Sequence, residues 1–254
     1  MPMTIDLTGT VMLVTGASRG IGRAIAVQAA ASGATVAVHY HQRREAAERL
    51  AAELGREARA FGADLGDVTA VRRLFERVVQ AYGRLHVLVN NAGIARSLPL
   101  DAPDEAWQAG WERTMAVNLQ APELLCRLAI RHFRQHGGGR ILNVASRAAF
   151  RGDTPEYMAY AASKGGLVAL TRSIARGFGK DGIVAFTLAP GFTRTDMAQD
   201  FIDTYGEAHA VRDLALDRLT RPEDIAPMAV LLASGLADHA TGATIDLNAG
   251  SYVH

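Results

Sequence analysis

Cysteine is nearly absent from this sequence: Cys126 is the single one in 254 residues, which excludes an intrachain disulfide and fits a reducing compartment. An excess of either charge is also absent. With 27 Lys and Arg against 26 Asp and Glu, the net charge of +1 gives no broad reason to bind nucleic acid or an anionic membrane. No apolar run approaches the length that crosses a bilayer, and the start of the chain lacks the pattern of a signal peptide. We therefore expect a cytoplasmic protein whose partners include neither nucleic acid nor membrane.

Internal division is absent as well. The composition, 49% hydrophobic and 21% charged, is that of a globular protein, and 254 residues are ordinary for one large α/β sheet domain. No repeat, low-complexity tract or linker rich in Pro, Gly or Ser separates one part of the chain from another. We predict a single domain over residues 1–254, in which the irregular stretch 194–220 forms a helical excursion or lid over the substrate.

Short β-branched runs alternate with helical stretches along the whole chain. Strands are predicted at residues 11–15, 35–40, 58–63, 85–90, 140–146, 183–189 and 243–247. Helices are predicted at residues 20–32, 43–54, 68–82, 105–135, 157–178 and 222–234. Apolar strands that alternate with helices indicate a parallel sheet covered on both faces. The predicted fold class is therefore α/β, a single doubly wound domain with seven parallel strands.

A glycine-rich turn, TGASRGIG at residues 15–22, joins the first predicted strand to the first predicted helix. A helix N-terminus at this edge of a sheet offers free N–H groups to a pyrophosphate, and glycines let the backbone approach the phosphates closely. The spacing G-x-x-x-G-x-G differs from the G-x-G-x-x-G fingerprint, and a turn without a ligand is the alternative. We predict that the turn binds a dinucleotide through Gly16, Ser18, Arg19, Gly20, Ile21 and Gly22.

Two further turns follow strands at the same edge. Asp64 and Leu65 come after the third predicted strand, and Asn91, Ala92 and Gly93 come after the fourth. A carboxylate in the first turn can accept a hydrogen bond from an adenine amino group, and a glycine in the second lets backbone pack near a ribose. Each could be a plain turn when taken alone. In this order along a doubly wound sheet, both are expected beside the cofactor.

The residues for acid–base chemistry are Tyr160 and Lys164, which lie four apart and so project from one face of the helix 157–178. A phenol with a pKa of about 10 is a reluctant acid at neutral pH, and a neighbouring ammonium lowers that pKa. Ser146, at the end of the fifth strand, is placed to donate a hydrogen bond to a substrate oxygen. Asn118 lies in the middle of the helix 105–135, where Asn is a mediocre helix former, and is expected to hold a water that links Lys164 to solvent.

A lone Tyr–Lys pair is usually a surface pair, but the ordered set of motifs resembles the short-chain dehydrogenase/reductase family over essentially the whole chain. Residues 190–195, PGFTRT, and the ending 241–250 are similar to that family as well. The resemblance implies a Rossmann-type fold, with Tyr160 as the acid–base, Ser146 polarising a carbonyl and Lys164 binding the nicotinamide ribose. It also implies that Asn118 anchors a proton-relay water. The nicotinamide carboxamide would be held by Pro190, Gly191, Thr193 and Thr195.

The end of the second strand indicates which nicotinamide is used. A carboxylate there would bind the adenosine ribose and select NAD, but Tyr40 and His41 occupy the place and no acid comes before Glu45. Arg19, with His41 or the arginines that follow, can clamp a 2′-phosphate. The alternative is that those arginines only form the solvated first turn of a helix. We predict NADP(H) as the cofactor in preference to NAD(H).

The substrate is a small carbonyl compound or alcohol whose identity stays open. The motifs are most similar to those of 3-oxoacyl-carrier-protein reductases, although sugar, steroid and small-alcohol dehydrogenases share them. Carrier reductases tend to have a basic residue just before the glycine that corresponds to Gly182. Asp181 occupies that place here, which disfavours docking of an acyl carrier. A non-catalytic NADP-binding sensor is the alternative from another class. Arg96, Arg147 and Arg151 are loop arginines that could meet an acidic substrate, although exposed loop arginines usually bind nothing specific. The family and the apolar helices imply a homotetramer, and no metal is expected because His132 and His136 lack a third ligand.

Overall fold

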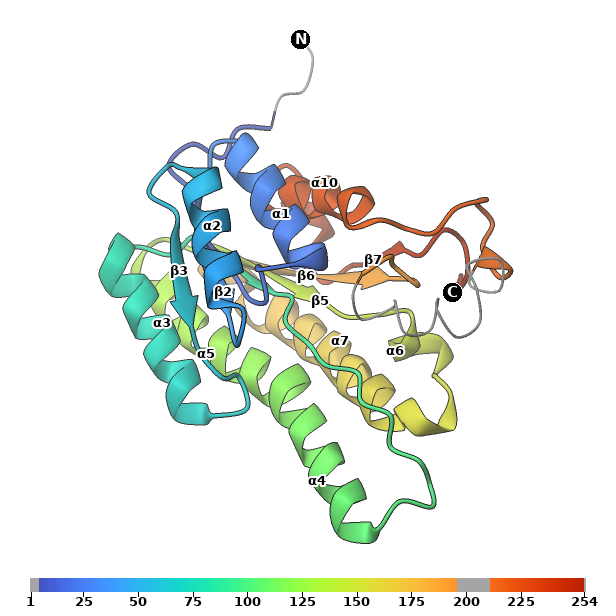
Figure 1. The fold of residues 1–254 in the computed structure, drawn as a ribbon. Coiled ribbons are helices and arrows are strands. Elements are labelled where there is room, and N and C mark those ends of the chain that lie inside the picture. Colours follow the sequence, from blue (N-terminus) through green and yellow to red (C-terminus); the bar gives the residue numbers. More distant parts are fainter. Residues whose placement is uncertain (1–4, 196–210, 254) are drawn as a thin grey trace.

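The computed structural model describes residues 5–195 and 211–253. One sheet of seven parallel strands has the order β3-β2-β1-β4-β5-β6-β7 (Figure 1). The strands are β1 Val11–Val14, β2 Thr35–Tyr40, β3 Arg59–Gly62, β4 Val87–Asn90, β5 Gly139–Val144, β6 Ile183–Pro190 and β7 Thr244–Leu247. The main helices are α1 Gly20–Ala31, α2 Arg44–Leu54, α3 Val68–Tyr82, α4 Asp104–Met115, α5 Ala121–Gln135, α6 Ala148–Arg151, α7 Met158–Phe178 and α10 Pro222–Ala233. The predicted fold class and all seven predicted strands are confirmed.

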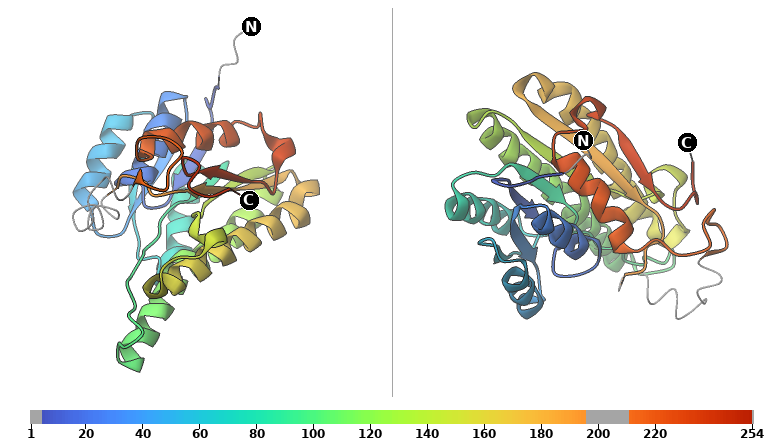
Figure 2. Two further views of the ribbon diagram at one scale, coloured as in Figure 1. Left: turned by 90° about the vertical axis from the view of Figure 1, so that its right-hand side faces the viewer. Right: turned by 90° about the horizontal axis from the view of Figure 1, so that it is seen from above.

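Helices cover both faces of the sheet. The helices α1, α2 and α10 lie on one face, and α3, α5 and α7 lie on the other (Figures 1 and 2). Successive side chains of β1 alternate between the two cores: Met12 and Val14 pack with α1 and α10, whereas Leu13 packs with α3 and α5. Because central strands such as β1 and β4 are buried on both sides, their sequences are apolar with little alternation.

The predicted helix 105–135 is interrupted. A π-helical turn, η1 Ala116–Gln120, separates α4 from α5, and in it the Ala121 N–H donates to the Ala116 carbonyl five residues earlier. Pro122 explains why the ladder changes here, because a proline has no N–H to give to the carbonyl of Asn118 four residues before it. The helix α4 extends away from the body of the domain (Figures 1 and 2).

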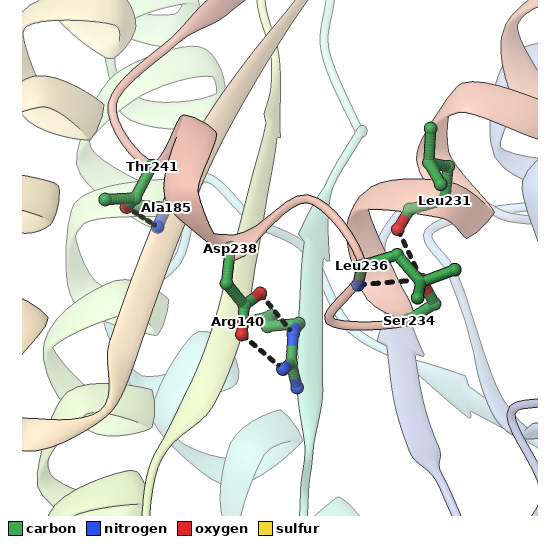
Figure 3. Close-up of polar contacts among 7 residues, drawn as sticks. All are labelled: Arg140, Ala185, Leu231, Ser234, Leu236, Asp238 and Thr241. Atoms are coloured by element: carbon green, nitrogen blue, oxygen red, sulfur yellow. Dashed lines mark hydrogen bonds and ion pairs between the residues drawn. The ribbon is translucent and has the colours of Figure 1, made fainter.

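The C-terminal part of the chain is fastened to the amino ends of two central strands. Arg140, at the start of β5, donates two hydrogen bonds to Asp238, at 3.0 and 2.7 Å, and Thr241 accepts one from the Ala185 N–H of β6 (Figure 3). These contacts cross 98 and 56 residues of sequence. They place β7 beside β6 as the last strand. In the described ranges, no helix is long and apolar enough to cross a membrane.

Candidate active site

The glycine-rich turn lies where β1 meets α1, as predicted. Gly16 and Gly20 adopt φ of +63° and +54°, a region that favours glycine. A Cβ on Gly16 would lie 3.0 Å from the Cα of Ala92, and one on Gly22 would lie 2.5 Å from the Gly16 carbonyl oxygen. Larger residues would therefore distort the turn. Arg19 is exposed and forms the N-cap of α1, so it lies at the mouth of the turn.

His39, which the sequence analysis did not single out, holds the glycine-rich turn in place. Its Nδ1 accepts a hydrogen bond from the Gly16 N–H at 3.0 Å, and its Nε2 lies 3.1 Å from the carbonyl of Ala63. An acceptor at Nδ1 and a donor at Nε2 define the neutral imidazole. Burial, the largest influence, lowers the pKa of His39 to about 4, which keeps it neutral. The signal in the sequence was a single polar residue inside an otherwise buried strand.

The turn after β4 is bonded to the turn after β1. The Thr15 hydroxyl accepts hydrogen bonds from the N–H groups of Asn91 and Ala92, at 2.9 and 3.0 Å. The Asn91 amide donates to the Thr15 carbonyl at 2.8 Å. Asn91 therefore acts through the backbone of the phosphate turn, and its side chain is committed to the protein itself.

Asp64 has partners that the sequence did not indicate. Its Oδ1 accepts from Arg113 of α4 at 2.6 Å and from the Gly66 N–H at 2.8 Å, and its Oδ2 lies 3.9 Å from the Nε2 of His41. The hydrogen bond from Arg113 is the main reason that the pKa of Asp64 is lowered. The guanidinium offsets the carboxylate charge next to His41, so the place expected for the adenosine ribose is not strongly negative.

Lys164, Asn118 and Gly93 meet at the carboxyl ends of β4 and β5. Lys164 is 4% exposed, and its Nζ donates to the Val144 carbonyl at 2.7 Å. A Cβ on Gly93 would lie 3.3 Å from both Lys164 Nζ and Asn118 Oδ1, so a larger residue would crowd both side chains. Burial lowers the pKa of Lys164 to about 8.

Tyr160 and Ser146 are brought together as predicted, but the electrostatics differ from expectation. Burial is the largest influence and raises the pKa of Tyr160, the Asp153 carboxylate raises it further, and a hydrogen bond with Ser146 opposes both. Lys164 was expected to lower this pKa. Its Nζ lies 5.7 Å from the centroid of the Tyr160 ring and is already engaged by Val144, so burial decides the direction of the shift.

The side chain of Asn118 is fully occupied by the protein. It exchanges two hydrogen bonds with the backbone of Ile94, both 2.8 Å, and donates to the Ser163 hydroxyl at 3.1 Å. A water held by this residue would therefore use the Asn118 backbone carbonyl, which lacks its α-helical donor because of Pro122. The side chain fixes the π-helical turn against the irregular segment that follows Gly93.

The turn after β6 faces the glycine-rich turn. The Gly191 N–H donates to Leu247 at 3.1 Å, and a Cβ on Gly191 would lie 2.7 Å from the Cα of Asn248. Thr195 lies opposite Gly20, because a Cβ on Gly20 would be 3.4 Å from the Thr195 Cγ2. The two ends of the expected lid are bonded together, since the Arg194 N–H donates to the Thr220 carbonyl at 2.9 Å. Residues 196–210 of that lid lie outside the described residues.

Known proteins are similar to this chain over nearly its whole length. A family model described as "Enoyl-(Acyl carrier protein) reductase" matches residues 16–252. A "Short-chain type dehydrogenase/reductase" of Picea abies is 35% identical over 260 residues, which cover 96% of this chain and 93% of the relative. The chain belongs to the short-chain dehydrogenase/reductase family.

Two solved structures extend the comparison to three dimensions. One is a 3-ketoacyl-(acyl-carrier-protein) reductase from Brucella melitensis complexed with NADH, with a TM-score of 0.89, 30% identity and coverage of 98% and 100% of the two chains. Another, from Beutenbergia cavernae, is assigned as an NAD(P) dependent gluconate 5-dehydrogenase and contains NADP at low occupancy. It has a TM-score of 0.90, 34% identity and coverage of 98% and 99%. Both support the Rossmann fold of this short-chain dehydrogenase/reductase.

The predictions of family, of oxidoreductase activity and of a nicotinamide cofactor are thereby confirmed for this short-chain dehydrogenase/reductase. Its own residues fit such a cofactor. The glycine-rich turn offers backbone without side chains at the N-terminus of α1, and Gly93 keeps open the space beside Lys164. The roles of individual residues rest on this geometry and are taken up below as proposals.

The histidines on α5 serve the fold. His132 Nε2 accepts a hydrogen bond from the Leu85 N–H at 3.0 Å, and the rings of His132 and His136 stack with centroids 4.0 Å apart. Burial, aided by the charge of His136, lowers the pKa of His132 to about 4. Within residues 5–195 and 211–253, no three His, Cys, Asp or Glu side chains gather as metal ligands.

Proposed function

We propose that this protein transfers hydride between NADP(H) and a carbonyl or secondary alcohol carbon, with Ser146, Tyr160 and Lys164 as its catalytic residues. The observation that carries the proposal is their convergence. Ser146 follows β5 and bonds to Tyr160, and Lys164 lies one helical turn from Tyr160 against the end of the same strand. Serine, phenol and ammonium of this kind, at the carboxyl edge of a doubly wound sheet, form an acid–base centre.

The cofactor would lie along the carboxyl edge of the sheet. The backbone of the glycine-rich turn would hold the pyrophosphate, and the adenosine would lie near Asp64 and His41. The nicotinamide ribose would reach Lys164, and the carboxamide would be held by the turn that begins at Pro190, with Thr193 and Thr195. When bound, the nicotinamide supplies or accepts the hydride.

The residues of the chain manage the proton and the charge on oxygen. In the reductive direction, the Tyr160 hydroxyl donates its proton to the carbonyl oxygen while the Ser146 hydroxyl donates a hydrogen bond to the same atom. The raised pKa of Tyr160 keeps the phenol protonated and ready to act as an acid. The Lys164 ammonium stabilises the phenolate that results, and its pKa of about 8 keeps it mostly charged at neutral pH.

Asn118 would complete the path by which Tyr160 regains its proton. Its side chain fixes the π-helical turn, and its backbone carbonyl faces no α-helical donor. A water accepted there would lie near Lys164, because Asn118 Oδ1 and Lys164 Nζ both flank Gly93. Asn118 is therefore a positioning residue for the proton relay.

The preference for NADP(H) over NAD(H) rests on charge at the end of β2. Tyr40 and His41 stand where a carboxylate would select NAD, and Arg113 offsets the carboxylate of Asp64 beside them. Arg19 at the N-cap of α1 supplies a guanidinium for the 2′-phosphate. These three features favour the phosphorylated cofactor.

A 3-oxoacyl thioester is one candidate substrate, and a sugar or small alcohol is the other. We further propose a homotetramer in the cytoplasm. The protruding helix α4 supports subunit contacts, because the indoles of Trp107 and Trp111 stack on it with centroids 5.4 Å apart and remain partly exposed.

A panel of carbonyl compounds and alcohols, assayed by nicotinamide absorbance with both cofactors, tests the proposal. We expect turnover of at least one compound and a higher kcat/KM with NADP(H). Binding of NADPH without turnover across the panel would contradict the enzymatic role and favour a nucleotide sensor.

A further inference from the structure

Arg147 follows the catalytic Ser146 directly, and its backbone is fixed to the active site. Its N–H donates to the Pro190 carbonyl at 2.9 Å, at the turn expected to hold the carboxamide. Its side chain is half-buried at the start of α6, and its Nη1 is fully buried. That nitrogen has no hydrogen-bond partner among residues 5–195 and 211–253.

Three charged side chains influence Arg147 electrostatically without bonding to it. Arg151, Asp153 and Asp213 all lie within electrostatic reach, but no hydrogen bond or ion pair joins Arg147 to any of them in the described part of the chain. Burial first, and then Arg151, lowers the pKa of Arg147. Asp153 also raises the pKa of Tyr160, so a single carboxylate is near both the guanidinium and the catalytic phenol. Arg147 itself lies at the site because it follows Ser146 directly and its N–H is bonded to the Pro190 carbonyl.

A buried guanidinium nitrogen that has lost its water and gained no acceptor is costly, and such groups in folded proteins normally have a partner. An anion from a ligand would supply one. The planar fork of arginine matches a carboxylate with two parallel hydrogen bonds, a fit that lysine does not offer. The three charges around Arg147, one arginine and two aspartates, sum to −1, so a phosphate dianion would meet more repulsion there than a monoanion would.

We infer that Arg147 binds a carboxylate of the substrate, so that the protein acts on an oxo acid or hydroxy acid whose carboxylate lies a few bonds from the reacting carbon. This inference rests on the proposed function and narrows it. A thioester of an acyl carrier has no carboxylate at that position, whereas a sugar acid or a short oxo acid does.

The test compares 2-, 3- and 4-oxo acids with their methyl esters, assayed with NADPH. For at least one position of the oxo group, we expect kcat/KM to favour the acid by about 30-fold or more. Arg147→Met should lower that acid-to-ester ratio by about 30- to 100-fold, and Arg147→Lys should give an intermediate ratio. Arg151→Met, an exposed arginine on the same short helix, is the matched control and should leave the ratio within about threefold of wild type.

Two results would overturn the inference: a wild-type enzyme that reduces esters as well as acids, or an Arg147→Met variant that lowers both equally, as a merely structural role would. The wild-type ratio decides the matter even where the Met variant does not fold. If wild type reduces none of these acids and esters, the broader panel of carbonyl compounds and alcohols decides the proposed function separately. Calorimetric titration of the same oxo acids into wild type and the Lys variant, with NADP present, then decides the role of Arg147: tighter binding to wild type supports it, and equal or no binding refutes it.

Discussion

The two edges of the sheet use polar residues in opposite ways. At the amino edge, Arg140 and Asp238 satisfy each other and His132 accepts a backbone N–H, so polar groups join distant segments of the chain (Figure 3). At the carboxyl edge, Lys164 is buried next to Tyr160, and Arg147 keeps a buried nitrogen without a partner in the described residues. The polar groups named at the first edge have partners within the protein, whereas Arg147 at the second has a buried nitrogen for which we propose a ligand as partner. This asymmetry is general in parallel α/β sheets, whose ligands bind at the carboxyl ends of the strands.

The largest effect should come from removing the acid at the carboxyl edge. Tyr160→Phe eliminates the hydroxyl that donates the proton and keeps the aromatic ring, so we expect kcat to fall by about 10²- to 10⁴-fold. Binding of NADPH, followed by fluorescence titration, should change little because the phenol contributes mainly to the chemistry. A kcat within tenfold of wild type would remove Tyr160 from the mechanism.

The second largest effect is expected on the preference for NADPH over NADH. Arg19→Ala removes the guanidinium expected at the 2′-phosphate, and we expect kcat/KM for NADPH to fall by about tenfold to several hundredfold, with a much smaller change for NADH. Tyr40→Asp should raise the use of NADH by giving the ribose hydroxyls an acceptor. The measurement is kcat/KM with both nicotinamides in all three proteins. Equal losses for both nicotinamides in Arg19→Ala would refute the phosphate clamp.

Acid should lower the free energy of unfolding, because each edge of the sheet contains a buried histidine that is neutral in the folded protein. The pKa of His39 and of His132 falls from 6.5 to about 4 in the folded protein, so between those values the unfolded chain binds protons that the folded chain does not. Above about pH 6.5 the two histidines therefore do not reduce the free energy of unfolding. As the pH falls from 6.5 toward 4, protonation of the unfolded chain lowers that free energy progressively. Urea unfolding at several pH values measures the free energy of unfolding directly. His39→Asn offers a donor and an acceptor without titrating, so it should reduce the slope, and an unchanged slope would contradict this account.

The smallest effect is expected at the amino edge. Asp238→Asn removes a carboxylate that is bonded twice to Arg140, and because both side chains are about one-third exposed, the loss should be about 1 kcal/mol of unfolding free energy. We expect kcat/KM to stay within twofold of wild type, since neither residue belongs to the site. A large loss of activity at unchanged stability would show that the two edges are less independent than their contacts indicate.

Much of the fold could be predicted because its signals are local. Strand β2 has the predicted bounds, and β6 extends one residue beyond its prediction, to Pro190, because short apolar runs between turns mark buried strands. The long helix 105–135 was wrong as a single element. Pro122 was the signal in the sequence of an interruption. The cost of a proline in a helix depends on whether the carbonyl four residues earlier, here that of Asn118, finds another donor, and the sequence does not show this.

By itself, the sequence determined which residues could carry the chemistry. The conformation of the glycine-rich turn depends on its local sequence, and Tyr160 and Lys164 share a face because of helical periodicity. Only the tertiary structure decided the environment of each group: that His39 holds Gly16, that Arg113 pairs with Asp64, and that burial sets the pKa of Tyr160 against the pull of Lys164. These contacts join elements far apart in the chain, and a charge or hydrogen bond acts over distance in space, not along the sequence.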